Sequence, residues 1–350
     1  MAEINKFTIL GETGSGKTCY LLGMYYEMTM GVAGYTLTTE NPDDDKNLTV
    51  RYEMLNDKKQ GKSRFPDPSD SMQKYNFNLQ YAYENILPFE WIDYPGGYLD
   101  PKLKNVNDEQ YKAVEKNIKE SDMLYICIDG ANLTGSSPNR KIRNVKSKCG
   151  RNISPYLAEF NGKLPPITMI VTKFDMCESD TDAGEVKEII EEAFEGLFQR
   201  DDVFIAIVPV SLGATLQDDS YSGDLDPLNI HLPILMGINF SLIKMLEYGR
   251  YLIENAKSNI RVADAIKRDE EDSFFLWRDN KKINRMKQYI EDKQKDIEHD
   301  KKVAQYFKKS LYRVNRDLAE IDMIFANGNW QDKRTIHRMW DDLQSVANYF

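Results

Sequence analysis

The chain is poor in cysteine, in histidine and in long apolar segments. Only four cysteines and three histidines occur among its 350 residues. The cysteines lie far apart and form no C-x-x-C pair, so neither a zinc ribbon nor a disulfide scaffold is expected, and a reducing, cytoplasmic setting fits this usage. No run of 18 apolar residues occurs, and the opening MAEINKF lacks the apolar core of a signal peptide, so we expect no membrane span and no secretion.

Basic charge is also scarce in the first two thirds of the chain. The formal net charge is −10. Residues 241–350 hold 22 Lys and Arg against 19 Asp and Glu, a net charge of +3, which leaves −13 for residues 1–240. An acidic globular part argues against nucleic acid as its main ligand. The dense mixed charges of the last third are typical of solvated helices.

Apolar strands alternate with helical patterns through residues 1–239. Strands are expected at 7–10, 74–83, 89–93, 123–129, 167–172 and 203–210, helices at 17–30, 108–120, 142–160 and 183–198, and an inserted helix within 41–61. This alternation predicts an α/β domain over residues 1–239, with a doubly wound, mostly parallel sheet. A ligand of such a sheet binds at the carboxyl ends of the strands.

A glycine-rich segment, GETGSGKT, follows the first strand and precedes the first helix. It fits the phosphate-binding pattern G-x-x-x-x-G-K-[ST], whose glycines let successive backbone N–H groups point at phosphate oxygens. Lys17 is expected to reach the outer phosphates and to act in catalysis, and the Thr18 hydroxyl to ligate Mg²⁺. The residues expected to form this cradle are Gly11, Glu12, Thr13, Gly14, Ser15, Gly16, Lys17, Thr18 and Cys19.

A second motif, D-Y-P-G-G, begins at the end of the expected strand 89–93. The Asp93 carboxylate can hold Mg²⁺ through a water, and the backbone N–H of Gly96 can contact a terminal phosphate. Such a D-x-x-G segment is also a common turn, so its interpretation depends on its place beside the glycine-rich loop.

A third motif, T-K-F-D, follows the strand 167–172. The Asp175 carboxylate can accept hydrogen bonds from the N1–H and N2–H₂ groups of guanine, which adenine cannot offer. The stem of Lys173 can lie along the base, and Ser211 and Leu212 can add backbone N–H groups. The alternative is an ordinary loop with an Asp cap. The motif, with Thr172, Lys173 and Asp175 as binding residues, predicts GTP or GDP as the ligand.

Together the three motifs resemble the translation-factor-related (TRAFAC) class of P-loop GTPases over about residues 5–240. T-K-F-D is similar to the T-K-x-D of dynamin-like GTPases. The opening FTILGETGSGKTCYL, the F-P-D-P-[ST] turn and D-x-P-G resemble bacterial conflict-system "double-GTPase" proteins, although one such domain is present here. The resemblance implies GTP hydrolysis with Mg²⁺ and a role in antiphage defence.

The resemblance also implies a switch hydroxyl on Mg²⁺ and a group that orients the attacking water. Ser69, 24 residues before Asp93, is the expected switch residue and Mg²⁺ ligand, with Thr38 as the second choice and a turn-capping role for Ser69 as the alternative. Many small GTPases place Gln directly after D-x-x-G, where this chain has Gly97. We therefore expect slow intrinsic hydrolysis, with the missing group supplied by a partner or by self-assembly. Within the chain, Glu12, Arg64 and Arg140 are candidates for it.

Residues 240–350 are expected to form a helical hairpin or coiled coil. Between residues 283 and 321, twelve positions spaced alternately three and four residues apart form a heptad pattern. Ten of them are apolar, and the exceptions are Lys293 and Asp300. Asn327-Gly328 is expected to end this helix, and a final helix to fold back. The region is interpreted either as a bundle packed on the first domain or as a stalk that binds a second copy or another protein. The helices show no basic amphipathic face of the kind that binds a membrane surface.

Three functions remain open from the sequence. The first is a GTP-switched protein, in which the segments at Ser69 and at Asp93–Gly97 order around the γ-phosphate. The second is a structural module that binds nucleotide, scarcely hydrolyses it and oligomerises through its helices. The third is a P-loop ATPase in which T-K-F-D is coincidental.

Overall fold

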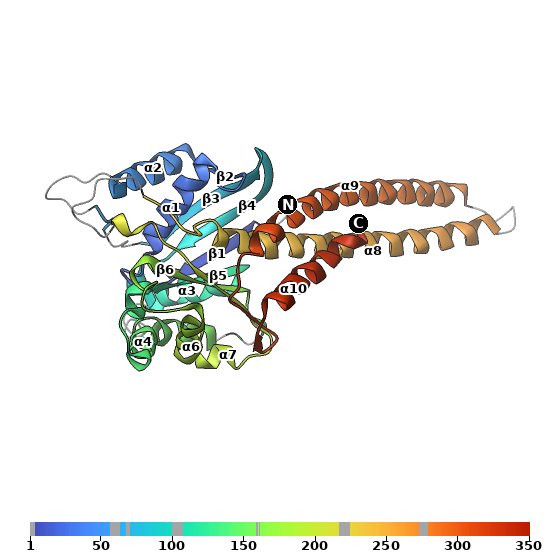
Figure 1. Cartoon of the computed structure of the whole chain (residues 1–350). Helices are drawn as coiled ribbons and strands as arrows, with labels where there is room; N and C mark the ends of the chain where they lie inside the picture. Colours follow the sequence, from blue (N-terminus) through green and yellow to red (C-terminus); the bar gives the residue numbers. More distant parts are fainter. Residues whose placement is uncertain are drawn as a thin grey trace. The chain divides into compact units, whose positions relative to one another are not determined.

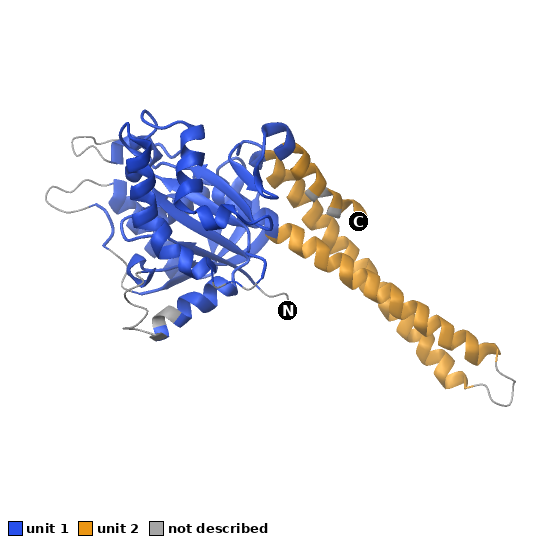
Figure 2. Cartoon of the chain, turned by 90° about the horizontal axis from the view of Figure 1, so that it is seen from below, with its two compact units in different colours: residues 1–240, 317–336 blue, residues 241–316, 337–350 orange. Residues whose placement is uncertain are grey.

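The computed structural model describes residues 4–56, 64–67, 71–99, 108–158, 160, 162–216, 225–272 and 279–350. The chain divides into two compact units (Figure 2). The first unit comprises residues 1–240 and 317–336, and the second comprises residues 241–316 and 337–350.

The described part of the first unit is built on a nine-stranded sheet of order β2-β3-β4-β1-β5-β6-β7-β8-β9 (Figure 1). The strands are β1 Asn5–Leu10, β2 Tyr35–Thr39, β3 Gln73–Tyr81, β4 Glu84–Asp93, β5 Met123–Asp129, β6 Ile167–Thr172, β7 Phe204–Pro209, β8 Ile324–Ala326 and β9 Asn329–Trp330. Strands β4, β1, β5, β6 and β7 are parallel, whereas β2 and β3 at one edge and β8 and β9 at the other are antiparallel. The central strands are almost entirely buried, as parallel strands covered on both faces must be.

Helices connect these strands. They are α1 Lys17–Met30, α2 Pro42–Asn56, α3 Asp108–Lys119, α4 Pro138–Val145, α5 Arg151–Ala158, α6 Ala183–Ala193 and α7 Glu195–Phe198, with a π-helical turn at Lys146–Gly150 between α4 and α5. Four short 3₁₀ turns begin within five residues of the carboxyl ends of parallel strands, at Gly96–Leu99, Gly130–Leu133, Phe174–Met176 and Ala214–Leu216. These four turns gather at one edge of the sheet, because parallel strands all end there.

The predicted mixed α/β architecture with a mostly parallel sheet is confirmed, but three strands were not predicted. Strand β2 contains Thr38, the second-choice switch residue, for which no strand was predicted. Thr38 pairs with Asn78 of β3 and is exposed, so it lies in the edge strand of the sheet. The second-choice switch residue is therefore not at the carboxyl ends of the parallel strands. Five residues are too few for a clear alternating pattern, which explains the omission.

Strands β8 and β9 lie in the region expected to be helical. Asn327 and Gly328 do not end a long helix, but form the turn of this hairpin with φ angles of 52° and 74°. Asn-Gly is the preferred pair for a two-residue hairpin turn because both positions need positive φ. Residues 240–350 therefore contribute strands to the sheet of the first unit, with Phe204 of β7 opposite Ala326 of β8.

The second unit is helical. Its helices are the later parts of α8 (Leu232–Asp272) and α10 (Lys333–Ser345), nearly all of α9 (Asn280–Leu318), and the 3₁₀ turn Val346–Tyr349. Ile253 and Ala256 of α8 pack with Ile297 of α9, and the ion pair between Glu270 and Lys282 joins the same two helices. They thus form an antiparallel hairpin (Figure 2).

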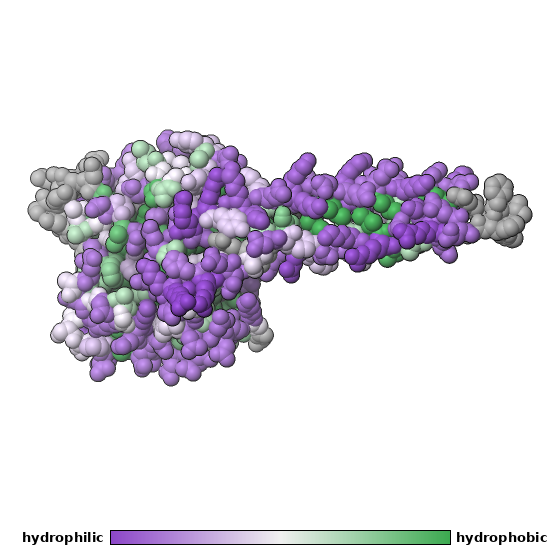
Figure 3. All heavy atoms as spheres, turned by 45° about the vertical axis from the view of Figure 1, so that its right-hand side comes forward, coloured by the Kyte–Doolittle hydropathy of each residue, from purple (hydrophilic) through white to green (hydrophobic). Residues whose placement is uncertain are grey.

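The predicted apolar positions on α9 are mostly turned inward. Ile283, Ile297, Ala304 and Leu311 are buried, whereas the polar exceptions at 293 and 300 are only half-buried. Apolar side chains also gather on the surface along the middle of the hairpin, flanked by hydrophilic ones (Figure 3). No described helix combines the length and the apolar character needed to cross a bilayer.

Candidate functional site

The glycine-rich loop is folded around its own lysine. Gly14 and Gly16 have φ angles of 83° and 86°, which side chains other than glycine rarely adopt. The Lys17 amine donates to the carbonyls of Gly11 at 2.7 Å and Glu12 at 3.0 Å, and its side chain is 7% exposed. The loop thus holds a buried positive charge at the start of α1, where the N-terminal end of the helix also favours an anion.

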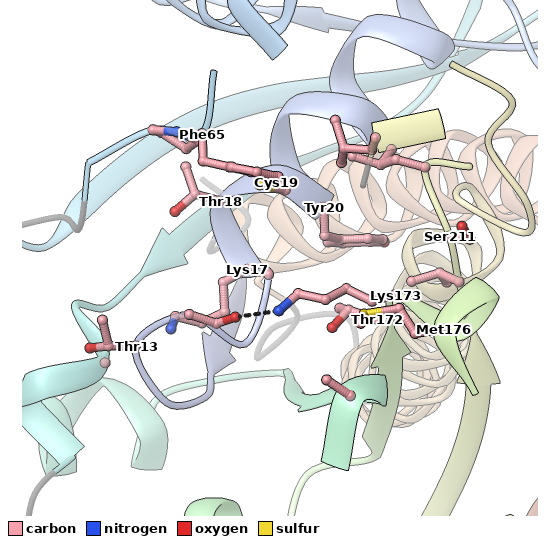
Figure 4. A pocket seen from close by; sticks show the side chains of 18 of the residues that line it. Thr13, Lys17, Thr18, Cys19, Tyr20, Phe65, Thr172, Lys173, Met176 and Ser211 are labelled. Carbon is pink, nitrogen blue, oxygen red and sulfur yellow. Dashed lines mark hydrogen bonds between the residues drawn. The ribbon is translucent and has the colours of Figure 1, made fainter. Parts of the chain in front are cut away.

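A cavity of about 550 Å³ opens beside this loop at the carboxyl ends of the strands. The predicted site residues that line it are Thr13, Gly14, Gly16, Lys17, Thr18, Cys19, Gly96, Thr172, Lys173, Asp175, Ser211 and Leu212. In Figure 4, Thr13 and Thr18 lie toward one end of the cavity, and Met176 and Ser211 toward the other. The first and third motifs, separated by more than 150 residues, therefore face one space.

The other predicted residues take different places. Gly11, Glu12, Ser15, Asp93 and Gly97 do not line the cavity wall. Ser69 lies outside the described residues, so its predicted role as a switch residue remains a prediction.

The third motif is fastened to the glycine-rich loop. Lys173 has a φ angle of 51°, and its amine donates to Gly14 O at 2.9 Å and to Asp129 Oδ2 at 2.8 Å. The Thr172 hydroxyl donates to Ser15 O at 2.6 Å. The hydrogen bonds to Gly14 and Ser15 fix the third motif relative to the glycine-rich loop.

The end of the cavity near Asp175 is also ordered. The Ser211 hydroxyl donates to the Asp175 carboxylate and accepts from the Gly213 N–H at 2.8 Å. Leu212 packs against α1 so closely that a Cβ on Gly23 would lie 2.2 Å from its Cδ2. The loop after β7 therefore holds the Asp175 carboxylate in the wall of the cavity and brings backbone groups beside it.

Asp93 lies at the end of β4, with 3% of its surface exposed. Its Oδ1 is buried and has no hydrogen-bond partner. Burial raises the pKa of Asp93 to about 6, although the charges of Lys17 and Arg51 act in the opposite direction. An unpaired buried carboxylate oxygen is costly, which suggests that a ligand satisfies it.

The glycine after Asp93-Tyr94-Pro95 touches the glycine-rich loop. A Cβ on Gly96 would lie 2.0 Å from Thr13 N, whereas a Cβ on Gly97 would meet nothing within 4 Å. Close packing thus requires glycine at 96, but not at 97.

The residues present suit Mg²⁺ bound together with a phosphate. The Thr18 hydroxyl and the Asp93 carboxylate are hard oxygen donors, which Mg²⁺ prefers. Among the described residues, no group of three or more His, Cys, Asp or Glu is placed to hold a metal by itself. Mg²⁺ does not need such a cage, because it keeps several waters and takes its remaining ligands from the substrate phosphates.

Several residues in or beside the cavity were not predicted from the sequence. Asp129 ends β5 and pairs with Lys173, and a Cβ on the next residue, Gly130, would lie 2.5 Å from Thr172 O. An acidic residue followed by glycine at the end of an apolar strand was the available signal. Phe65 and Met176 line the cavity as well. Phe65 begins the F-P-D-P turn, but neither residue was predicted to bind a ligand.

Comparison with known proteins adds little to this geometry. No family model matches the chain, and no curated protein sequence matches it. Among solved structures, the chain is similar to the GTPase-like domain of Ski7 from S. cerevisiae, determined with bound GTP, at 15% identity and a TM-score of 0.33. The alignment covers 63% of this chain and 45% of that chain. A TM-score this low supports no inference about the ligand.

Proposed function

We propose that this chain binds GTP and GDP with Mg²⁺ and hydrolyses GTP slowly, acting as a nucleotide-dependent switch. The observation that carries the proposal is one cavity with the Lys17 loop toward one end and Asp175 with Ser211 toward the other. Lys173 joins the two through its hydrogen bond to Gly14 O at 2.9 Å. A nucleoside triphosphate needs a positive cradle for its phosphates and a separate group that reads the base.

The carboxylate at Asp175 favours guanine over adenine. Guanine offers two adjacent N–H donors to an acceptor-only carboxylate, and adenine does not. Each hydrogen bond to a charged group contributes about 1.5–3 kcal/mol, so Asp175→Ala should weaken GTP binding by on the order of 10²–10⁴-fold. Glu178→Ala is the matched control, because Glu178 lies on the same loop but lines a different cavity.

Calorimetry with GTP, GDP, ATP and XTP tests the base assignment. Asp175→Asn places an amide donor where xanthine carries a carbonyl oxygen, so this variant should lose GTP and gain XTP. Equal binding of ATP and GTP by the wild type, unchanged by Asp175→Ala, would favour a P-loop ATPase. No binding of any triphosphate, or binding unaffected by Lys17→Ala, would refute nucleotide binding.

Slow hydrolysis is proposed because Gly97 provides no side chain to orient water. A second candidate function, a structural module with bound nucleotide and almost no turnover, is favoured by the same observation. Single-turnover hydrolysis by dilute protein distinguishes the two. Turnover at many per second would contradict both.

We also propose that the helical unit associates with a second copy or a protein partner. Tyr248, Tyr251, Val262 and Ile266 of α8 are at least one-third exposed, and they recur at intervals close to whole helical turns. Light scattering of the full chain with GDP and with a GTP analogue tests this. Val262→Asp with Ile266→Asp should abolish self-association, and Ser258→Asp is the control for added charge. A role in bacterial defence is proposed from the motif resemblance alone.

A further inference from the structure

The reaction proposed for this site lacks an assigned cation for the charge that develops during phosphoryl transfer. Lys17 is already assigned to the outer phosphates, and Lys173 is held by Asp129 and Gly14. Arg64, a candidate from the sequence, donates to the carbonyls of Thr215, at 3.0 Å, and Leu216. Arg64 is therefore engaged beside the loop after β7, away from the expected phosphate end.

A different arginine lies on the inserted helix α2. Helix α2 is fastened to α1, which begins at the glycine-rich loop. The Tyr52 hydroxyl of α2 donates to Glu27 at 2.9 Å, and its ring stacks on Tyr26 with centroids 4.0 Å apart. The residue before Tyr52 is Arg51, which is half-buried. A rigid platform thus carries this guanidinium.

Arg51 lines a second cavity of about 350 Å³. Its walls include Gln73, which is the Cα partner of Asp93 across the β3–β4 pair, and Asp67, which also lines the main cavity. The second cavity therefore adjoins the main one on the side of the predicted Mg²⁺ ligand Asp93.

Arg51 is available for a further ligand. Burial raises the pKa of the Tyr75 hydroxyl, and Arg51 counteracts this by its charge and by a hydrogen bond. Asp44 and Asp67 line the same cavity. However, within the described part of the chain, neither forms an ion pair with Arg51. A tyrosine hydroxyl is a weak partner that a phosphate oxygen can displace, because hydrogen bonds between two ionised groups are about twice as strong.

We propose that Arg51 is a catalytic residue, an arginine supplied within the chain that contacts the γ-phosphoryl group of GTP. This rests on the proposed function. A water oxygen forms the new bond to the γ-phosphorus while the bond to the β–γ bridging oxygen breaks. The electron pair goes to GDP, and the water proton leaves with the inorganic phosphate. Arg51 stabilises the negative charge on the transferring group, as guanidinium groups do in other phosphoryl-transfer sites.

The expected rate follows from combining Arg51 with the glycine at position 97. GTPases that carry their arginine within the chain hydrolyse at about 10⁻² s⁻¹, and those that lack it hydrolyse at about 3–5 × 10⁻⁴ s⁻¹. Since this chain lacks a water-orienting side chain at 97, we expect single-turnover hydrolysis at or somewhat below about 10⁻² s⁻¹.

The test compares Arg51→Ala and Arg51→Lys with Lys46→Ala in the full chain. Lys46 is an exposed cation on the same helix and serves as the control for loss of charge. Single-turnover GTP hydrolysis should fall at least about tenfold in Arg51→Ala, with partial retention in Arg51→Lys. The affinity for GDP should not change, and the affinity for GDP with aluminium fluoride, which mimics the transferring phosphoryl group, should fall with the rate.

The other possible outcomes contradict either the role of Arg51 or the proposed function. Hydrolysis by Arg51→Ala at the wild-type rate would overturn the proposal, and so would the absence of any turnover in a wild type that binds GTP. A fall in GDP affinity parallel to the rate, or a lowered melting temperature shared with Arg51→Lys, would indicate a structural role and also overturn it. If the wild type bound no guanine nucleotide, the proposed function itself would fail.

Discussion

The neighbouring glycines 96 and 97 offer a direct test of whether the segment after β4 must touch the glycine-rich loop. A Cβ on Gly96 would lie 2.0 Å from Thr13 N and 2.5 Å from the carbonyl carbon of Glu12. Heavy atoms pack best at about 3.5–4.0 Å, so Gly96→Ala forces the two backbones apart by roughly 1 Å or more. Gly97→Ala adds the same methyl group in open space and is the matched control.

The cost of Gly96→Ala should be about 1–3 kcal/mol, which is typical of overpacking a well-packed site. If the segment swings away, the cost appears as a loss of affinity for a GTP analogue of about 5–150-fold, with GDP less affected. If the segment stays in place, the cost appears instead in the free energy of unfolding. Calorimetry with both nucleotides and urea unfolding of both variants measure the two quantities. Equal values for Gly96→Ala and Gly97→Ala in both assays would refute the packing argument.

Three further predictions concern single side chains. The pKa of Asp93 is raised from 3.8 to about 6, so the native state favours the protonated carboxyl group. The contribution of this group to the free energy of unfolding is therefore complete below about pH 4 and is lost as the pH rises through 6. In nucleotide-free protein, Asp93→Asn should therefore raise the free energy of unfolding at pH 7.5 by up to about 3 kcal/mol, but not at pH 4. The same substitution should weaken Mg²⁺-dependent GTP binding. A gain in stability that is independent of pH would contradict this reasoning. Arg64→Ala should release residues 64–67 from Thr215 and speed nucleotide dissociation in stopped-flow measurements, and an unchanged rate would show that this contact is irrelevant to the cavity. Lys141→Met should lower the free energy of unfolding, measured in urea, by about 3 kcal/mol, because Lys141 is 1% exposed and pairs with Glu185 at 3.0 Å. A loss below about 1 kcal/mol would show that the ion pair is not needed for stability.

The sequence predicted those site residues whose positions follow from strand ends. Gly14, Lys17, Lys173 and Asp175 directly follow apolar strands or sit in the turn into the next helix. Parallel strands end at a common edge, so their adjacency in space was deducible. The pairing of Lys173 with Gly14 O at 2.9 Å needed the three-dimensional structure, since nothing in the spacing specifies which backbone carbonyl a lysine reaches.

The positions of residues in the insertion between β2 and β3 could not be predicted from the ends of the parallel strands. Arg51 lies on α2, where helical spacing shows which face is apolar, but not which neighbour that face covers. Phe65 lies in a turn outside this helix. The neighbour is set by contacts such as the stacking of Tyr52 on Tyr26, which are tertiary. The short strands β2, β8 and β9 were missed for a related reason, because strands of two to five residues take their structure from the adjacent strand rather than from their own pattern.

The contacts around the cavity divide it into two sides with different mechanical properties. On one side, Lys173 and Thr172 tie the T-K-F-D motif, the proposed base-reading element, to the glycine-rich loop through hydrogen bonds of 2.9 Å and 2.6 Å, so these two elements must move together. On the other side, Gly96 rests on Thr13 by close packing of backbone atoms. A packing contact has no preferred partner atom, so it can be exchanged for a phosphate oxygen at low cost, whereas a buried hydrogen bond cannot be given up without replacement. A change of nucleotide should therefore be sensed by the segment after Asp93 and leave the base-reading side unchanged, which is the asymmetry that a γ-phosphate switch requires.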